Sequence, residues 1–254
     1  MRNIVKSLMS VAFMAAATPS LAATIVFSNG GTSASSGNVI FTAGLGSEAV
    51  QVRASAWTLN GSTVSASTLG VYSNGLGVTN GNEGNGGGNS HTIDNLNGID
   101  FIILQFDKKV WLDDATFTAY QQTNYSYTDT DATIGYGTTA TAWNSSLNLA
   151  GNVSLLNSLI PTAQRYPSGN VGTQGTNTRD IDPLLYSGNV WIVSAAVANP
   201  DSKIDSFKFN YLNYTTKMPV PEPATWMMMI SGFGMIGSTM RRRKPFKTVA
   251  EATS

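Results

Sequence analysis

Alternation between apolar and polar side chains is the feature that most constrains the fold of this chain. Ala49–Trp57 and Ser206–Tyr214 both alternate in this way. A period of two predicts half-buried β-strands, because successive side chains of a strand point to opposite faces of the sheet. Asp100–Phe106 is apolar almost throughout, which is typical of a central strand in a sandwich.

The rest of the middle of the chain repeats this β pattern. Many short strands separated by Gly and Asn turns predict an all-β fold, an antiparallel β-sandwich or jelly-roll-like ectodomain. Only Ser145–Ile160 is loosely helical in its apolar spacing. Asn74–Ser90 is rich in Gly and Asn and is predicted to be a flexible surface loop, and Pro161–Asp182 is a second polar stretch. The further predicted strands are Thr24–Ser28, Asn38–Ala43, Thr63–Tyr72, Ala115–Tyr120, Thr133–Tyr136 and Asn189–Ala198.

The N-terminus has the features of a secretory signal peptide. Arg2 and Lys6 precede a short apolar run at Leu8–Ala17. Small residues then favour cleavage between Ala22 and Ala23. The sequence therefore predicts export by the Sec machinery and removal of residues 1–22 by signal peptidase.

The C-terminus predicts a membrane segment. Three prolines in 219–223 make a stiff spacer, and Ala224–Met240 follows without a charged residue. As a helix these 17 residues span about 25 Å, slightly less than a bilayer core of roughly 30 Å. Because cations stay on the cytoplasmic side, the ectodomain is expected outside and the tail inside. The cations that set this orientation are Arg241, Arg242, Arg243 and Lys244.

These features divide the chain into a signal peptide (1–22), an ectodomain (23–218), a Pro-rich motif (219–223), a transmembrane helix (224–240) and a basic tail (241–254). The ectodomain alone carries eight Lys and Arg against 13 Asp and Glu, a net charge of −5. This charge argues against a nucleic-acid partner. The chain has no cysteine and one histidine, which excludes disulfides, thiolate metal sites and His-rich metal sites.

The C-terminal segment resembles a known sorting signal. Val220, Pro221, Glu222, Pro223 and Trp226, followed by a Gly-containing apolar helix and an Arg cluster, are similar to the PEP-CTERM signal in its PEP-x-x-W variant. Such signals are typical of Gram-negative exopolysaccharide producers. The resemblance implies recognition of Pro-Glu-Pro by an exosortase and cleavage nearby, with Trp226 at the membrane interface. The ectodomain would be anchored transiently at the inner membrane, facing the periplasm, and then reach the cell surface or extracellular matrix.

The sequence departs from that signal at two points. Met227 follows the tryptophan where alanine is usual, and eleven residues trail the arginines. A second resemblance covers 91–136, where His91–Asn95, Asp100–Phe106 and Asp129-Thr130-Asp131 are similar to exosortase-dependent surface proteins of the XDP type. It implies placement and fold but no chemistry.

Several aspartates are candidates for ligand or acid–base chemistry. Asp129 and Asp131 are spaced to share one face of a strand. Such a pair could bind Ca²⁺ or serve glycoside hydrolysis, but turn formation is the favoured interpretation. Asp113-Asp114 and Asp180/Asp182 offer the same alternatives. We therefore predict no enzyme and no required cofactor, with Ca²⁺ as the open alternative.

A catalytic triad of Ser90, His91 and Asp94 is disfavoured. Ser90 is the direct neighbour of His91 in a Gly-rich segment, where a nucleophile is poorly positioned. We expect a structural role for His91 instead.

Aromatic residues among Thr, Asn and Gln suggest glycan contact. Flat rings stack on sugars while amides and hydroxyls bond the sugar hydroxyls, although filling of the sandwich core is the commoner role. The predicted function is a structural or polysaccharide-associated interaction protein of the surface matrix. The alternatives are a secreted glycoside-active enzyme and a Ca²⁺-dependent adhesin. The aromatic candidates are Tyr120, Tyr125, Tyr127 and Trp143, with Tyr136 nearby.

Overall fold

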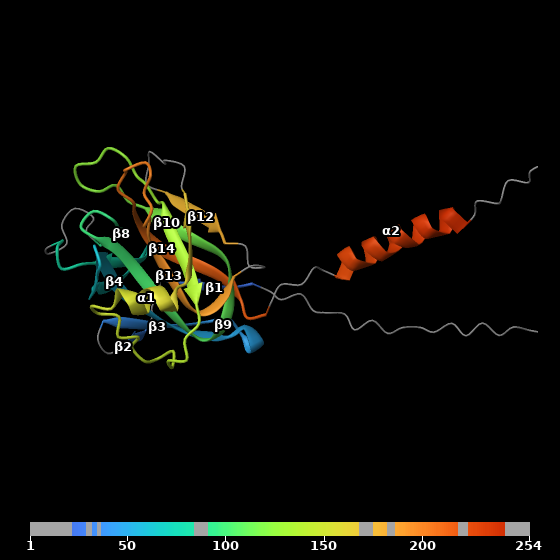
Figure 1. Cartoon of the computed structure of the whole chain (residues 1–254), viewed down its shortest axis with the longest axis horizontal. Helices are drawn as coiled ribbons and strands as arrows, with labels where there is room; N and C mark the ends of the chain where they lie inside the picture. The colour runs from blue at the N-terminus through green and yellow to red at the C-terminus, as the bar shows by residue number, and fades with distance from the viewer. Residues whose placement is uncertain are drawn as a thin grey trace, which may run out of the picture. The chain divides into compact units, whose positions relative to one another are not determined.

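The structure is a computed structural model that describes residues 22–28, 32–34, 37–83, 91–167, 175–181, 186–217 and 223–241. The chain divides into two compact units. One is Ser20–Pro219, and the other is Met1–Pro19 together with Val220–Ser254. The first contains the described strands and a short helix, and the second contains helix α2 (Figure 1).

The elements of the first unit are nearly all strands. Its helical elements are the 3₁₀ turn η1 (Gly46–Glu48) and the helix α1 (Val153–Leu159). The strands are β1 (Ala23–Val26), β2 (Thr32–Ala34), β3 (Asn38–Ala43), β4 (Val50–Asn60), β5 (Thr63–Ala66), β6 (Thr68–Tyr72), β7 (Gly75–Thr79), β8 (Ile93–Asp94), β9 (Ile99–Ala119), β10 (Ala132–Gly137), β11 (Thr162–Tyr166), β12 (Thr176–Asp180), β13 (Ser187–Ala195) and β14 (Ser206–Thr215).

Strand β9 organises this domain because its 21 residues take part in both layers. Residues 99–106 pair with β4 on one edge and β13 on the other. Residues 111–119 pair with β14 and β12. The first layer continues from β4 to β3 and β5, and from β13 to β10 and β11. The second continues from β14 to β1, β8 and β7, and from β7 to β6. Every pair is antiparallel, and the predicted all-β antiparallel sandwich is confirmed.

The two layers bury one apolar core between them. Phe117, Phe207 and Phe209 of the second layer are fully buried, with the rings of Phe117 and Phe207 4.6 Å apart. Val52 and Leu104 of the first layer belong to the same cluster. The period-two pattern therefore identified Phe207 and Phe209 as core residues, but it is wrong for Tyr211. The register of β14 shifts after Phe209, so that Leu212 and Tyr214 face the core instead.

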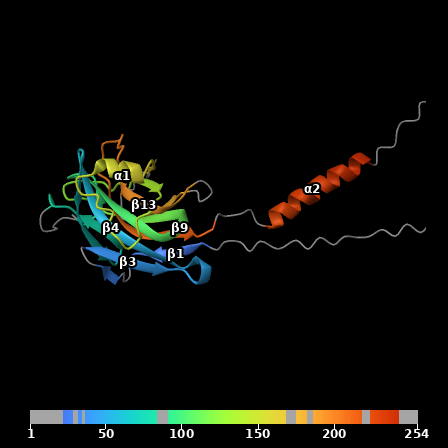
Figure 2. The same ribbon diagram turned by 60° about the horizontal axis from the view of Figure 1, so that its bottom comes forward.

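A second apolar cluster lies on the outer face of the first layer, where α1 packs over β9 and β13 (Figure 2). Phe101 points into this cluster together with Leu156 of α1. For this reason the prediction that β4 is half-buried is wrong. Trp57, on the face predicted to be exposed, is only 8% exposed, and Arg53 beside it is 6% exposed. The Arg53 guanidinium donates to Gln105 Oε1 at 2.6 Å.

The predicted helix Ser145–Ile160 is shorter than expected. Helix α1 begins after Asn152, whose side chain accepts a hydrogen bond from the Leu155 N–H at 2.9 Å. Just before it, Asn148 and Gly151 have positive φ angles of 53° and 70°, which a helix cannot accommodate. Leu147 and Leu149 pack into the second cluster without a helix.

The prediction of a flexible loop over Asn74–Ser90 is wrong for its first part. Residues 75–79 form strand β7, and Leu76 and Val78 are completely buried. A Cβ on Gly77 would lie 1.8 Å from the carbonyl oxygen of His91. Glycine is needed here for close backbone packing. Residues 84–90 lie outside the described residues.

Other predicted boundaries also shift. Thr63–Tyr72 is two strands, β5 and β6, and the polar stretch Pro161–Asp182 contains β11 and β12. The segments Asp100–Phe106 and Ala115–Tyr120 join into one strand, because Asp107, Lys108 and Lys109 between them stay exposed while the backbone remains extended.

The second unit contains helix α2 (Pro223–Arg241). Its large side chains are exposed, including Met228 at 75% and Phe233 at 69%. Among the described residues, none of the helices combines the length and apolar character needed for a membrane crossing. The transmembrane helix therefore stays a prediction, as does the signal peptide, of which residues 1–21 lie outside the described residues.

Candidate functional site

The two ends of the β-domain lie next to each other in one ladder. Strand β1 starts at Ala23, which pairs with Tyr214 near the end of β14. Ala23 is also the first residue after the predicted signal cleavage. The domain thus begins at the predicted processing point, and its last strand ends a few residues before the Pro-rich motif, whose residues 219–222 lie outside the described residues.

Glu48 fastens the C-terminal end of the domain. Its carboxylate accepts hydrogen bonds from Thr216 N–H at 2.9 Å and Thr216 Oγ1 at 2.6 Å. Its backbone carbonyl accepts from the Tyr214 hydroxyl at 2.8 Å, and Lys217 lies 3.8 Å from the carboxylate. Burial alone would raise the pKa of Glu48, but the Thr216 bonds outweigh it and the pKa is lowered. We call these contacts the Glu48 clamp.

The structure brings the predicted pair Asp129 and Asp131 together and adds Asp205. One carboxylate oxygen from each lies within 4.8 Å of the others, and all three residues are buried. Asp205 immediately precedes β14 and lies more than 70 positions after Asp131 in the sequence. Its Oδ2 accepts hydrogen bonds from Asn95 Nδ2 at 2.6 Å and Ala196 N–H at 3.0 Å.

Two arginines offset the charge of this first cluster. Arg165 of β11 forms an ion pair with Asp131. Arg179 of β12 donates to Thr130 Oγ1 at 2.7 Å, between the two aspartates. Burial lowers the pKa of Arg179, while Asp131 and Asp129 act to raise it. Burial, then repulsion from Asp129, raises the pKa of Asp205 to about 8.

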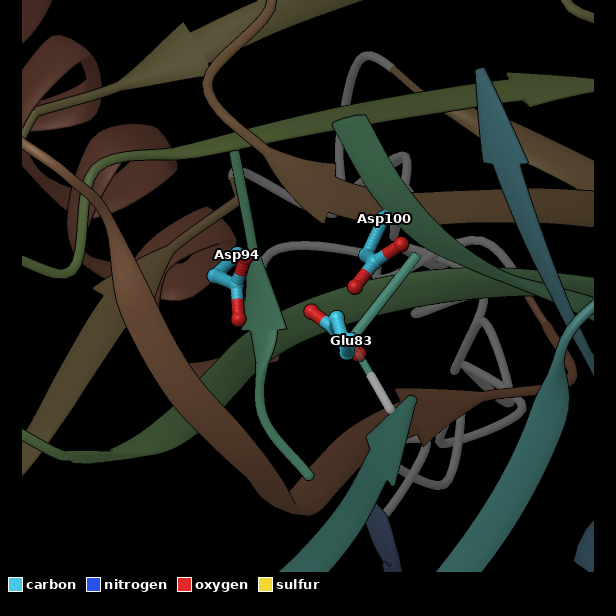
Figure 3. Close-up of side chains that lie close together, drawn as sticks. All are labelled: Glu83, Asp94 and Asp100. Atoms are coloured by element: carbon cyan, nitrogen blue, oxygen red, sulfur yellow. The ribbon is translucent and has the colours of Figure 1, made fainter. Parts of the chain in front are cut away.

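A second carboxylate cluster comprises Glu83, Asp94 and Asp100, and sequence reasoning did not predict it. These residues follow β7, end β8 and lie at the start of β9, respectively. One oxygen of each lies within 4.8 Å of the others. Figure 3 shows the carboxylates of Asp94 and Asp100 on either side of Glu83. The sequence signal that could have identified two of them is an aspartate within a strand of buried residues, as at Asp94 in β8 and Asp100 in β9.

Hydrogen bonds hold two of these carboxylates in place. Asp94 Oδ2 accepts from Thr92 Oγ1 at 3.0 Å and Gln122 Nε2 at 2.9 Å, and its Oδ1 accepts from Leu96 N–H at 3.0 Å. Asp100 Oδ1 accepts from Thr58 Oγ1 at 2.5 Å and from an amide N–H of Asn80 at 3.2 Å.

The three pKa values in this cluster are raised. Burial, joined by repulsion from the neighbouring carboxylates, raises the pKa of Asp100 to about 8 and that of Glu83 to about 7. Burial raises the pKa of Asp94 to about 6. Within the described ranges the ion pairs are Arg165–Asp131 and Lys217–Glu48, so no cationic side chain is paired with this cluster.

The other predicted aspartates lie at the edge of the second layer. Asp114 accepts a hydrogen bond from Asn213 Nδ2 at 2.9 Å and pairs in register with Asp180 of β12. Burial, then repulsion from Asp114 and Asp180, raises the pKa of Asp113. Asp182 lies outside the described residues.

The predicted aromatic residues do not form one platform. Tyr136 packs in the core against Trp191, as the core-filling alternative expects. Tyr125 and Tyr127 pack edge to face with their centroids 5.6 Å apart. Trp143 is partly buried, and no ring contact joins it to these tyrosines within the described part of the chain.

Tyr120 belongs to a different group on the outer face of the second layer. The Lys208 ammonium lies 3.7 Å from the ring centre of Tyr72 and 4.8 Å from that of Tyr120. The Tyr120 hydroxyl accepts a hydrogen bond from Asn74 Nδ2 at 2.8 Å. Sequence reasoning missed Tyr72 because it lies far from Tyr120 in the chain. We call Tyr72, Lys208 and Tyr120 the tyrosine–lysine group.

Among the described residues, His91 contacts Thr79 and Tyr72. Its Nδ1 lies 2.8 Å from Thr79 Oγ1, and its ring stacks on Tyr72 with the centroids 5.6 Å apart. Asp94 bonds to other groups, as described above, and Ser90 lies outside the described residues. The structural role expected for His91 fits these contacts.

A cavity of about 340 Å³ lies between α1 and the outer face of the first layer. Its walls are mainly apolar and include Phe101, Leu156 and Ile192. Arg165, which pairs with Asp131, therefore contacts the first carboxylate cluster and also borders this cavity.

The fold and the segment after it define a class: an all-β domain with a C-terminal sorting segment. Within that class, residues 219–244 match the family model of the PEP-CTERM protein-sorting motif. The chain thus carries a PEP-CTERM sorting motif at these residues, which supports exosortase-dependent sorting of a surface protein and implies export and membrane-associated sorting. Comparison with curated proteins gives no match. The XDP-type resemblance stays a prediction.

Proposed function

We propose that this chain delivers its β-domain to the cell surface or extracellular matrix, where the domain acts by binding rather than by catalysis. One observation supports the delivery step: the described strands and both apolar clusters of the β-domain lie before the predicted cleavage site. Its last strand ends at Thr215, eight residues before α2 begins at Pro223. Cleavage near Pro221–Pro223 would remove no strand and neither apolar cluster.

The helix supports a membrane-associated intermediate. Its large apolar side chains are exposed on the isolated unit, and apolar surface of this kind is stabilised by a nonpolar environment. In this proposal Trp226 anchors at the interface, and Arg241, Arg242, Arg243 and Lys244 hold the tail in the cytoplasm.

The sorting step is tested with Glu222→Ala in the natural host. We expect the variant to accumulate as a membrane-bound form whose intact mass still includes Trp226–Ser254. Glu251→Ala makes the same chemical change outside the motif and should be processed normally. Normal processing of the Glu222→Ala variant would refute the role of the motif.

Burial favours binding over hydrolysis. Asp129 and Asp131 are each 1% exposed, and Asp131 is ion-paired to Arg165. Carboxylates in this state cannot reach a glycosidic bond in solvent. The glycoside-active alternative would instead require turnover that is lost in Asp129→Asn or Asp131→Asn.

The tyrosine–lysine group supports polysaccharide as the bound partner. Tyr72 and Tyr120 offer rings on the outer face of the second layer, with Lys208 between them. Thr118 and Asn210, whose side chains contact each other at 3.5 Å, add hydroxyl and amide groups nearby. Rings flanked by such groups suit the two faces of a sugar.

Affinity electrophoresis of the β-domain in gels containing host exopolysaccharide tests this partner. Tyr72→Ala and Tyr120→Ala should each weaken retention by about 2- to 10-fold, the range for loss of one aromatic contact. Tyr125→Ala, which removes a ring from the separate Tyr125–Tyr127 pair, serves as the control. No retention of the wild-type domain would refute polysaccharide binding.

A further inference from the structure

We propose that Glu83, Asp94 and Asp100 bind one calcium ion where β7, β8 and β9 meet. This site is distinct from the Asp129–Asp131 pair considered from the sequence, and it does not depend on the proposed polysaccharide binding. We call it the β7–β9 site.

The spacing of the carboxylates fits a single ion. One oxygen from each residue lies within 4.8 Å of the other two. Calcium binds oxygen ligands at 2.3–2.6 Å, so ligands on opposite sides of one ion are separated by about 5 Å. All three oxygens can therefore contact the same ion.

A buried oxygen without a partner points to a ligand. Asp100 is completely buried, and its Oδ2 has no hydrogen-bond partner among the residues that the structure describes, whereas its Oδ1 has two. A buried carboxylate oxygen is costly when it is left unpaired. In Figure 3 the Asp100 carboxylate points toward Glu83, into the space between the three groups. Asp94 Oδ1 accepts only one hydrogen bond in the described structure, which leaves a lone pair for an ion.

Charge distinguishes this cluster from the Asp129, Asp131 and Asp205 cluster, where Asp205 Oδ1 is likewise buried without a hydrogen-bond partner among the described residues. There, Arg165 pairs with Asp131 and Arg179 lies alongside. At the β7–β9 site, the groups that contact the carboxylates are the neutral side chains of Thr58, Asn80, Thr92 and Gln122 and backbone N–H groups. Three carboxylates gathered without a cationic side chain require a bound cation or protons.

The ligand chemistry selects calcium. All three side chains offer hard oxygen donors, and the chain has no cysteine. Glu83 follows a turn while Asp94 and Asp100 belong to strands. A site with one adaptable ligand accommodates the variable coordination of Ca²⁺ more readily than the strict octahedron of Mg²⁺. The ion would tie the turn after β7 to β8 and β9.

The test uses the β-domain, residues 23–219, because this unit contains the described strands and both apolar clusters. After removal of divalent ions with EDTA, CaCl₂ is titrated while calorimetry measures binding and melting. We expect one ion per chain. At a concentration one hundred times the dissociation constant, the melting temperature should rise by about 5–10 °C.

Three variants localise the site. Asp100→Asn should abolish the calcium-induced shift. In EDTA it should melt at or above the wild-type temperature, because the neutral amide does not have to take up a proton to be buried. Glu83→Gln provides the same test at a partly exposed position, in case Asp100→Asn does not fold. Asp107→Asn changes an exposed carboxylate of the same strand and should keep the full shift.

Three results would overturn the proposal. One is a wild-type domain that neither binds calcium nor melts higher with it. Another is a calcium shift that persists in Glu83→Gln or in folded Asp100→Asn, which would place the ion elsewhere. The third is an equal shift with the same concentration of Mg²⁺, which would exclude calcium selectivity.

Discussion

Replacing Arg165 by glutamine tests whether arginine, and not a metal ion, balances the first carboxylate cluster. Arg165 pairs with Asp131, whose side chain is 2% exposed, while the Arg165 side chain is 28% exposed. Glutamine keeps most of the side-chain length but removes the charge. Asp131 would then remain buried with Asp129 and Asp205 and would lose its ion pair with Arg165, while Arg179 stays alongside.

The magnitude follows from this burial. Removing one partner of a fully buried ion pair costs about 3–5 kcal/mol, because the remaining charge is uncompensated. Partial exposure of Arg165 lets water approach, so we expect a cost of about 2–4 kcal/mol in the free energy of unfolding. For a domain of this size the melting temperature should fall by about 5–15 °C.

Urea unfolding of the β-domain measures this cost, and a double-mutant cycle assigns it. Asp131→Asn alone should cost less than Arg165→Gln, because it also removes one of three neighbouring negative charges. In the double variant, part of the Arg165→Gln cost should be recovered, with a coupling of at least about 1 kcal/mol. A cost below about 1 kcal/mol for Arg165→Gln, or purely additive effects, would refute the reasoning.

Two further predictions concern pH and backbone packing. In EDTA the free energy of unfolding should fall as pH rises from about 4 to about 8. Burial raises the folded-state pKa of Asp100 and Asp205 to about 8, so over this range the folded state holds protons that the unfolded state has released. Urea unfolding at pH 5 and 8 measures this difference, and greater stability at pH 8 would contradict the prediction. Gly77→Ala should destabilise the domain by about 2 kcal/mol or more, because the added Cβ would clash with the His91 carbonyl. Gly81→Ala is the control and should change stability little, because a Cβ at Gly81 would have no atom within 4 Å. Thermal melting of both variants provides the comparison.

Local alternation was sufficient to predict the strands but not how they join. Asp100–Phe106 is apolar on both faces because the second layer covers one face and α1 covers the other. The same cover over Trp57 buries both faces of β4 from Val52 to Thr58, and no pattern within β4 could show it. Strand β7 was missed because glycine normally signals a turn, whereas Gly77 is selected here by close contact with the backbone at His91.

The candidate sites show the same limit more strongly. Asp129 and Asp131 were found because they are two residues apart, although they precede β10 and do not share a strand face as expected. Asp205 reaches them only through the pairing of distant strands. Glu83, Asp94 and Asp100 are dispersed over three elements. The sorting motif was recognised from sequence because its Pro-Glu-Pro and Arg cluster are contiguous. A contiguous motif can be recognised from the sequence alone. A site whose residues come from several strands can be predicted only when the pairing register of those strands is known.

The Glu48 clamp yields a prediction about how the sorting motif is presented. Glu48→Gln should weaken both hydrogen bonds from Thr216 and remove the charge facing Lys217. Bonds to a charged acceptor are worth about 1.5–3 kcal/mol in full burial, and at this rim we expect about 1–2 kcal/mol of local stability.

If opening is fast relative to cleavage, that loss raises trypsin cleavage after Lys217 by about 5- to 30-fold. Cleavage after Lys108 within β9 needs global opening and should accelerate much less, so the ratio of the two rates, followed by mass spectrometry, isolates the clamp. Equal acceleration at both lysines would mean that Glu48 supports the whole fold and does not specifically hold the end that leads into the sorting motif.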